Sequence, residues 1–200
     1  KEAAAGRPIA YLTGSKEFFS LPLEVTPDVL IPRPETEVLV ERTIDIVRKS
    51  GSQGAALLDL GTGSGCIAVS LARHLPQARL FASDISPPAL EVARRNATRH
   101  GVGERIEFRL GNLFEPWLAP GADGQPPAFD IVVCNPPYVR TNDPQLARNV
   151  LDFEPHLALF AGPDGLDVIR RLVADAGRWL TPGGHLLLEV AYDQASAVRD

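Results

Sequence analysis

Apolar and polar positions follow two periodicities along this chain, one typical of buried strands and one typical of helices that cover a sheet. Short apolar runs bounded by turn-forming residues predict strands at 55–60, 79–83, 105–110, 129–134 and 185–190. Between them, apolar residues recur every three or four positions and predict helices at 34–49, 66–74, 86–100 and 165–180. Because strands and helices alternate, we expect an α/β fold with a mostly parallel sheet and helices on both faces.

Four other segments have weaker patterns. Residues 7–14 have the composition of a connector, and 17–31 predict a short β-hairpin in front of the sheet. Residues 119–127 and 139–163 have no periodicity, so we expect both to be surface segments. The second is long enough to shape the side of the molecule on which a partner binds.

Composition narrows the class of protein. The chain has 200 residues, of which 44% are hydrophobic and 22% charged, as in an ordinary globular domain. A net charge of −5 and a pI of about 5.4 argue against direct binding to nucleic acid. Cys66 and Cys134 lie in apolar segments and are expected to be reduced, and no His/Cys cluster predicts a metal site. No stretch approaches the roughly 18 apolar residues of a membrane span, so we expect no membrane contacts. We also expect a cytoplasmic monomer.

The stretch Asn135-Pro136-Pro137-Tyr138 directly follows the predicted strand 129–134. Proline has no N–H, so the strand must stop here with a stiff backbone at its carboxyl end, where open α/β sheets bind ligands. This turn suits a planar NH2 group, whose lone pair is delocalised. We expect the Asn135 side-chain oxygen and the Pro136 carbonyl to accept its two hydrogens, and the Tyr138 ring to lie against its flat face. A plain strand stop beside a half-buried aromatic is the alternative interpretation.

A glycine-rich turn follows the predicted strand 55–60. Gly61, Gly63 and Gly65 give G-x-G-x-G, whereas a dinucleotide fingerprint has G-x-G-x-x-G. Asp84 ends the next strand, at the place of the acidic residue that holds a ribose diol in doubly wound folds. Together they resemble class I S-adenosylmethionine-dependent methyltransferases. The resemblance implies that the cofactor contacts Gly61, Thr62, Gly63, Ser64, Gly65, Asp84, Ile85, Asn112, Leu113 and Asn135.

A closer resemblance rests on several motifs in order. They are Ala10-Tyr11-Leu12-Thr13-Gly14, Phe18-Phe19, Ile31-Pro32-Arg33-Pro34-Glu35-Thr36-Glu37, the glycine turn with Leu58-Asp59-Leu60 before it, Asn135-Pro136-Pro137-Tyr138 and Phe153-Glu154-Pro155. This set resembles the HemK/PrmC family, N5-glutamine methyltransferases of class I peptide chain release factors, over nearly the whole chain. The family implies that S-adenosylmethionine is the methyl donor and S-adenosylhomocysteine the product. It also implies that Asn135, Pro136, Pro137 and Tyr138 bind the glutamine of a Gly-Gly-Gln loop, with Asn135, Pro136 and Tyr138 catalytic.

The family pattern also implies a domain arrangement. We expect residues 1–16 to be the linker from a missing N-terminal helical domain, and 17–200 to be the catalytic domain, cut short at its C-terminal end. Many members carry Asp where this chain has Asn112, and we interpret Arg33 as a solvated charge.

Two other functions stay open. An N6-adenine DNA or RNA methyltransferase must also position a planar, weakly nucleophilic NH2 group. However, this chain offers no target-recognition domain and no net positive charge. A non-catalytic S-adenosylmethionine-binding scaffold is the third hypothesis, and intact site turns argue against it.

Overall fold

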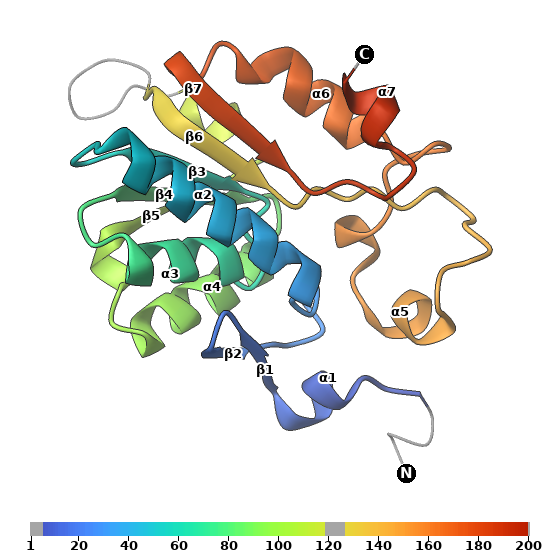
Figure 1. Ribbon diagram of the computed structural model, residues 1–200. Helices are drawn as coiled ribbons and strands as arrows, with labels where there is room; N and C mark the ends of the chain where they lie inside the picture. The colour runs from blue at the N-terminus through green and yellow to red at the C-terminus, as the bar shows by residue number, and fades with distance from the viewer. Residues whose placement is uncertain (1–5, 119–126, 200) are drawn as a thin grey trace.

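The computed structural model describes residues 6–118 and 127–199, and these residues form an open parallel sheet with helices on both faces (Figure 1). Its strands are β3 (Ala56–Leu60), β4 (Arg79–Asp84), β5 (Ile106–Leu110), β6 (Phe129–Cys134) and β7 (Leu180–Leu188), in the order β5-β4-β3-β6-β7. The chain runs outward from β3 to β5 and then returns to β6 on the other side of β3. The predicted doubly wound fold is therefore confirmed, with its topological switch between β3 and β6.

Alternate side chains of the central strands pack on opposite faces of the sheet. On one face lie α2 (Glu37–Ser50), α3 (Cys66–His74) and α4 (Pro87–Arg99), which pack on residues such as Leu57 and Ile131 (Figure 1). On the other face lie α6 (Asp167–Ala176) and the 3-10 turn η4 (Glu115–Trp117), which pack on Leu58 and Val132. Every residue of β3 is buried, which explains why this strand has no polar-apolar alternation in the sequence.

The N-terminal segment differs from its sequence-based prediction. The connector contains a short helix, α1 (Ile9–Thr13), and the hairpin is β1 (Ser15–Phe18) with β2 (Leu21–Glu24), shorter than the predicted 17–31. Its two-residue turn, Phe19-Ser20, has positive φ at both positions (49° and 60°), as a type I′ turn requires. Neither residue is one that usually signals this turn, so the sequence pattern could not fix the bounds.

Segment 139–163 is also more ordered than predicted. It contains α5 (Arg148–Phe153) and the 3-10 turn η5 (His156–Ala158), and Val139 bridges to Phe160. Glu154, Leu159 and Ala161 are buried, whereas the other residues of the segment are exposed or partly exposed, so the segment lies at the surface but is not irregular throughout. The other segment, 119–127, lies outside the described residues except for residue 127.

The last strand begins earlier than predicted. Strand β7 starts at Leu180, and a register shift between Phe129 and Ile131 of β6 accommodates the Thr181–Gly184 stretch that the sequence suggested as a break. Correspondingly, α6 ends at Ala176 and not near 180. Short elements complete the fold: η2 (Pro34–Thr36), η3 (Gly103–Arg105) and α7 (Ala195–Arg199). Within residues 6–118 and 127–199, no helix combines the length and hydropathy that a bilayer crossing needs.

Candidate active site

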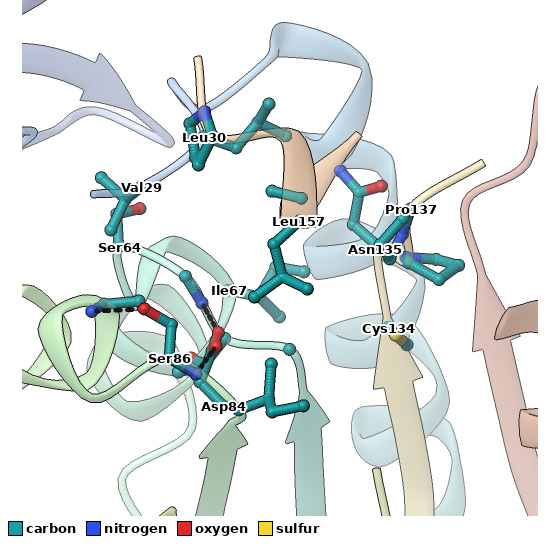
Figure 2. Close-up of a pocket in the computed structure, with 18 of the residues that line it drawn as sticks. Val29, Leu30, Ser64, Ile67, Asp84, Ser86, Cys134, Asn135, Pro137 and Leu157 are labelled. Carbon is teal, nitrogen blue, oxygen red and sulfur yellow. Dashed lines mark hydrogen bonds between the residues drawn. The ribbon is translucent and has the colours of Figure 1, made fainter. Parts of the chain in front are cut away.

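A cavity of about 300 Å³ opens over the carboxyl ends of β3, β4 and β6. Its walls come from the glycine turn after β3, from Asp84 after β4 and from Asn135 after β6, and Figure 2 shows Asp84 and Asn135 on two sides of it. Leu30 and Leu157 belong to its wall as well and come from segments outside the sheet. The cavity therefore occupies the switch point of the strand order, where doubly wound folds bind their ligands.

The glycine turn adopts a conformation that side chains would resist. Gly61, Gly63 and Gly65 have φ of 67°, 54° and 81°, in the left-handed region. Residues 61–64 line the cavity, whereas Gly65 does not. A Cβ on Gly65 would lie 3.1 Å from the Cβ of Ala93, so this glycine lets α3 start close to α4. Of the predicted cofactor residues in the turn, the first four are thus placed to contact a ligand, and Gly65 shapes the turn from behind.

Asp59 holds the glycine turn from beneath. Its Oδ2 accepts the Thr62 hydroxyl at 2.7 Å and the Ala68 N–H at 3.1 Å. The carboxyl is completely buried, and its Oδ1 has no hydrogen-bond partner among the described residues. Burial raises the pKa of Asp59 to about 7, although the two hydrogen bonds act in the opposite direction. This residue therefore fixes the shape of the turn and does not line the cavity itself.

Asp84 lines the cavity at the end of β4. Its Oδ2 accepts the N–H of Gly63 at 2.8 Å and its Oδ1 accepts the N–H of Ser86 at 2.9 Å (Figure 2). Burial raises the pKa of Asp84, and the backbone N–H groups counteract that rise. Each oxygen keeps a second lone pair, so the carboxylate can still accept two hydroxyl protons from a diol. Ile85, the next residue, lines the same wall.

Asn112 and Leu113 line the cavity after β5, and their contact with a cofactor, which the resemblance implies, stays a prediction. Leu113 has φ of 48°, which is strained for a side chain of this kind. Gly111 precedes them, and a Cβ there would lie only 2.6 Å from Pro116 Cγ, so the turn depends on glycine. Strained backbone of this kind is common at ligand-binding sites, and it persists only where the surrounding packing holds it in place.

After β6, Asn135, Pro136 and Pro137 line the cavity. Among the described residues no backbone N–H donates to the Pro136 carbonyl, which therefore stays available as an acceptor. The Asn135 side-chain Nδ2 donates to Thr36 Oγ1 at 3.0 Å. Tyr138 does not line the cavity, and its hydroxyl donates to Glu189 at 3.1 Å. Stacking of its ring against an acceptor group stays a prediction.

The proline-rich stretch and the first residue of α2 contribute three polar side chains, each of which reaches a different distant segment. Arg33 pairs with Glu154 at 2.5 Å, Thr36 donates to Glu189 at 2.7 Å, and Glu37 accepts the N–H of Phe19 at 2.8 Å. The interpretation of Arg33 as a solvated charge is therefore wrong, because Arg33 forms an ion pair and lines the cavity. The reason is Glu154, a buried carboxylate that the irregular pattern of 139–163 did not reveal.

Both cysteines line the cavity and are unpaired, as predicted. Burial raises the pKa of the Cys66 thiol to about 12 and raises that of Cys134 well above its ordinary value. Both thiols are therefore protonated near neutral pH, and neither is an activated nucleophile. The described residues also contain no group of acidic, histidine or cysteine side chains arranged to hold a metal ion.

Sequence reasoning missed several residues of this site, and four of them matter for the argument. Thr36 and Glu189 support Asn135, and Leu30 and Leu157 form part of the wall. Thr36 carried one usable signal, since it stands in a motif that the sequence analysis had singled out. Leu157 is 60% exposed although it is a large apolar side chain, which is typical of a surface that a ligand or partner covers.

Known sequences similar to this chain are methyltransferases. The family model described as methyltransferase small domain matches residues 36–153. Release factor glutamine methyltransferase of Burkholderia pseudomallei is 51% identical over 98% of this chain and 67% of its own length. The proteins of the same name from Vibrio cholerae and Xylella fastidiosa are 46% and 44% identical, with 65% and 69% of their lengths covered. The chain thus spans about two thirds of the length of these relatives.

Solved structures show the same fold at low sequence identity. An S-adenosylmethionine-dependent methyltransferase from Agrobacterium tumefaciens has a TM-score of 0.59 and 16% identity, covering 88% of this chain and 52% of that one. A ribosomal protein L11 methylase from Lactobacillus delbrueckii has a TM-score of 0.56 and 19% identity, covering 84% and 66%. The fold is therefore that of S-adenosylmethionine-dependent methyltransferases, as expected. With half its sequence identical to a named relative, the chain belongs to the release factor glutamine methyltransferase family.

Proposed function

We propose that this protein transfers a methyl group from S-adenosylmethionine to the side-chain amide nitrogen of the glutamine in the Gly-Gly-Gln motif of class I release factors. The observation that carries the proposal is the shared cavity: the glycine turn and Asp84 open into the same space as Asn135 and Pro136. A donor site and an acceptor site for a planar NH2 group are thus contiguous. The similarity to release factor glutamine methyltransferases supports this acceptor over an adenine base.

The residues present fit the cofactor. We assign the ribose hydroxyls to Asp84, because its carboxylate is buried, oriented by two backbone N–H groups and still able to accept. Asn112 and Leu113 would flank the adenine, and the methionine part would lie along residues 61–64. When bound, S-adenosylmethionine supplies a methyl group on a positively charged sulfur, a strong electrophile, and S-adenosylhomocysteine is left.

At the acceptor side, the task of the protein is positioning. Asn135 Oδ1 and the Pro136 carbonyl would each accept one hydrogen of the glutamine NH2, which aims the nitrogen at the methyl group. Transfer would form the new N–C bond as the S–C bond breaks, and the nitrogen, made acidic by the transfer, would release one proton to solvent. The thiols that line the cavity are protonated, and no base is needed in this scheme. Orientation of this kind can contribute a large part of a rate enhancement.

The rest of the protein follows from the same proposal. The partner would be a release factor without direct contact to nucleic acid, consistent with the net charge of −5. We place the reaction in the cytoplasm, where translation terminates, and infer a monomer. We also infer that 17–200 is the catalytic domain and that 1–16 lead to it from a helical domain among the third of the relatives' length that this chain does not span.

Transfer of labelled methyl groups tests the function directly. The protein is offered a release factor, the same factor with its Gly-Gly-Gln glutamine changed to glutamate, and DNA. We expect label only in the first. Asn135→Ala should lower the single-turnover rate by about 10²-fold or more, as loss of a positioning contact can. Gln77→Ala, an exposed amide before β4 at the end of the sheet opposite the cavity, is the control and should react at the wild-type rate. Label in DNA, or full activity of Asn135→Ala, contradicts the proposal.

A further inference from the structure

A chain of hydrogen bonds connects the end of β6 to the end of β7 through η2, the 3-10 turn that precedes α2. Asn135 Nδ2 donates to Thr36 Oγ1 at 3.0 Å, and Thr36 Oγ1 donates to Glu189 Oε2 at 2.7 Å. The other carboxylate oxygen, Oε1, accepts the Tyr138 hydroxyl at 3.1 Å. Glu189 is itself fixed, because its backbone N–H donates to the Cys134 carbonyl at 3.1 Å.

The direction of these bonds follows from the chemistry of the groups. A carboxylate can only accept, so the single proton of the Thr36 hydroxyl is committed to Glu189. That hydroxyl can then only accept from Asn135, and it accepts from the NH2 end of the amide. The oxygen end faces away from Thr36, and among the described residues none donates to it. If the amide were flipped, the Asn135 oxygen would face Thr36 Oγ1. The only proton of that hydroxyl is already donated to Glu189, so no hydrogen bond could form between the two oxygens.

We propose that Thr36 and Glu189 are positioning residues that fix the orientation of the Asn135 side-chain amide, so that its oxygen and not its nitrogen is offered to the acceptor NH2. This inference rests on the proposed function, in which Asn135 Oδ1 accepts a hydrogen from the NH2 group of the substrate glutamine. A flipped Asn135 would instead direct its own NH2 group at the glutamine NH2, and the two donors could not form a hydrogen bond. Thr36 is 1% exposed, and its hydroxyl accepts from Asn135 and donates to Glu189. Tyr138 supports the same carboxylate from the other side.

The variants separate orientation from mere stability. Thr36→Val removes the hydroxyl while keeping the shape, and Glu189→Leu removes the acceptor that polarises Thr36. Thr36→Ser keeps the hydroxyl. Glu189→Gln keeps an acceptor oxygen for Thr36 and can donate its NH2 to the Tyr138 oxygen, so it should preserve the orientation. Glu35→Gln, an exposed neighbour in the same motif, is the control.

Single-turnover methylation of a release factor at saturating cofactor is the first measurement. We expect Thr36→Val and Glu189→Leu to lose about 10-fold or more in rate, with the dissociation constant for S-adenosylhomocysteine changed less than about twofold. Thr36→Ser, Glu189→Gln and Glu35→Gln should stay within about threefold of the wild-type rate. In an Asn135→Ala background, Thr36→Val should add no further loss, since it acts through Asn135. Wild-type activity of Thr36→Val, or an equal loss in both backgrounds, overturns the proposal.

A second measurement does not depend on the proposed function. The side-chain NH2 resonances of Asn135, identified in ¹⁵N spectra by their absence in Asn135→Ala, should shift in Thr36→Val and exchange faster with water. They should be nearly unchanged in Thr36→Ser. If the wild type methylates no release factor, the proposed function fails while this result still decides the orientation. Unaltered Asn135 resonances in a folded Thr36→Val protein overturn the inference whatever the activity. If Thr36→Val does not fold, the same spectra of Glu189→Leu and Glu189→Gln decide it.

Discussion

Arg33 and Glu154 form an ion pair with 2.5 Å between Nη2 and Oε1, although they are 121 positions apart in the chain. Only 2% of the Glu154 side chain is exposed, against 31% for Arg33. The second oxygen of Glu154 accepts the N–H of Ile31 at 3.1 Å. A single carboxylate thus attaches segment 139–163 to the proline-rich stretch that forms one wall of the cavity.

Removing this carboxylate should loosen both segments. Glu154→Ala leaves the Ile31 N–H and the Arg33 guanidinium without their acceptor, and we expect it to lower the free energy of unfolding by about 1–3 kcal/mol. Urea denaturation measures the loss, and hydrogen exchange should become faster in 139–163. Glu35→Gln, which changes an exposed charge in the same motif, should leave both quantities unchanged. Equal stability of the two variants would contradict this role of Glu154.

The parts of the fold and site that were predictable from sequence are those that local residue types determine. Three glycines dictate the turn after β3, and two prolines stop β6 at Asn135, so both cavity walls could be placed from short patterns. The mostly parallel sheet with helices on both faces followed from the alternation of apolar strands and helices, whereas the order of the strands was not predicted.

What could not be predicted depends on pairs far apart in the chain. Thr36 and Glu189 are 153 positions apart, and no short pattern couples them. Likewise, the residues of the hairpin turn, Phe19 and Ser20, have positive φ although neither is glycine or asparagine. Strand β7 continues through Gly183 and Gly184 because its register with β6 shifts there. In each case tertiary packing, and not local preference, decides the conformation.

Asp84 should govern cofactor affinity. Asp84→Ala removes the acceptor that we assign to the ribose hydroxyls, and we expect affinity for S-adenosylhomocysteine to weaken by about 1–3 kcal/mol. Isothermal calorimetry gives the value, with Asp175→Ala on the exposed side of α6 as the control. Because Asp84 also holds the N–H groups of Gly63 and Ser86, a thermal melt must accompany the titration. Unchanged affinity, or binding of NAD by the wild type, would rule out this cofactor assignment.

Asn96 should be a stability determinant close to the cofactor site. It is completely buried on α4, accepts the N–H of Glu24 at 2.7 Å, and donates to the carbonyls of Glu24 and Ser64 at 2.9 and 2.8 Å. Asn96→Leu keeps the approximate volume but leaves three backbone groups unpaired. We expect a loss of about 1–3 kcal/mol or more and a fall in Tm of at least several degrees. Asn149→Leu, an exposed position, serves as the comparison, and a similar Tm for both would refute the prediction.

The buried carboxyl group of Asp59 should make the stability of the protein depend on pH. Burial raises its pKa to about 7, from an ordinary value of 3.8. Between these two values the folded protein keeps a proton that the unfolded chain has released, so raising the pH through this window removes stability. The slope from this group is at most about 1.4 kcal/mol per pH unit, and it vanishes above the folded-state pKa.

Asp59→Asn isolates that contribution. Its amide oxygen can still accept from Thr62 and Ala68, but the side chain no longer ionises, while every other titrating group is retained. In the absence of cofactor, we expect the Tm of the wild type minus that of Asp59→Asn to fall steadily from about pH 4 to about pH 7 and then level off. Thermal melts in matched buffers across this range provide the measurement. A difference that is constant or rises with pH would mean that Asp59 is ionised in the folded protein, and that the glycine turn rests on a buried negative charge.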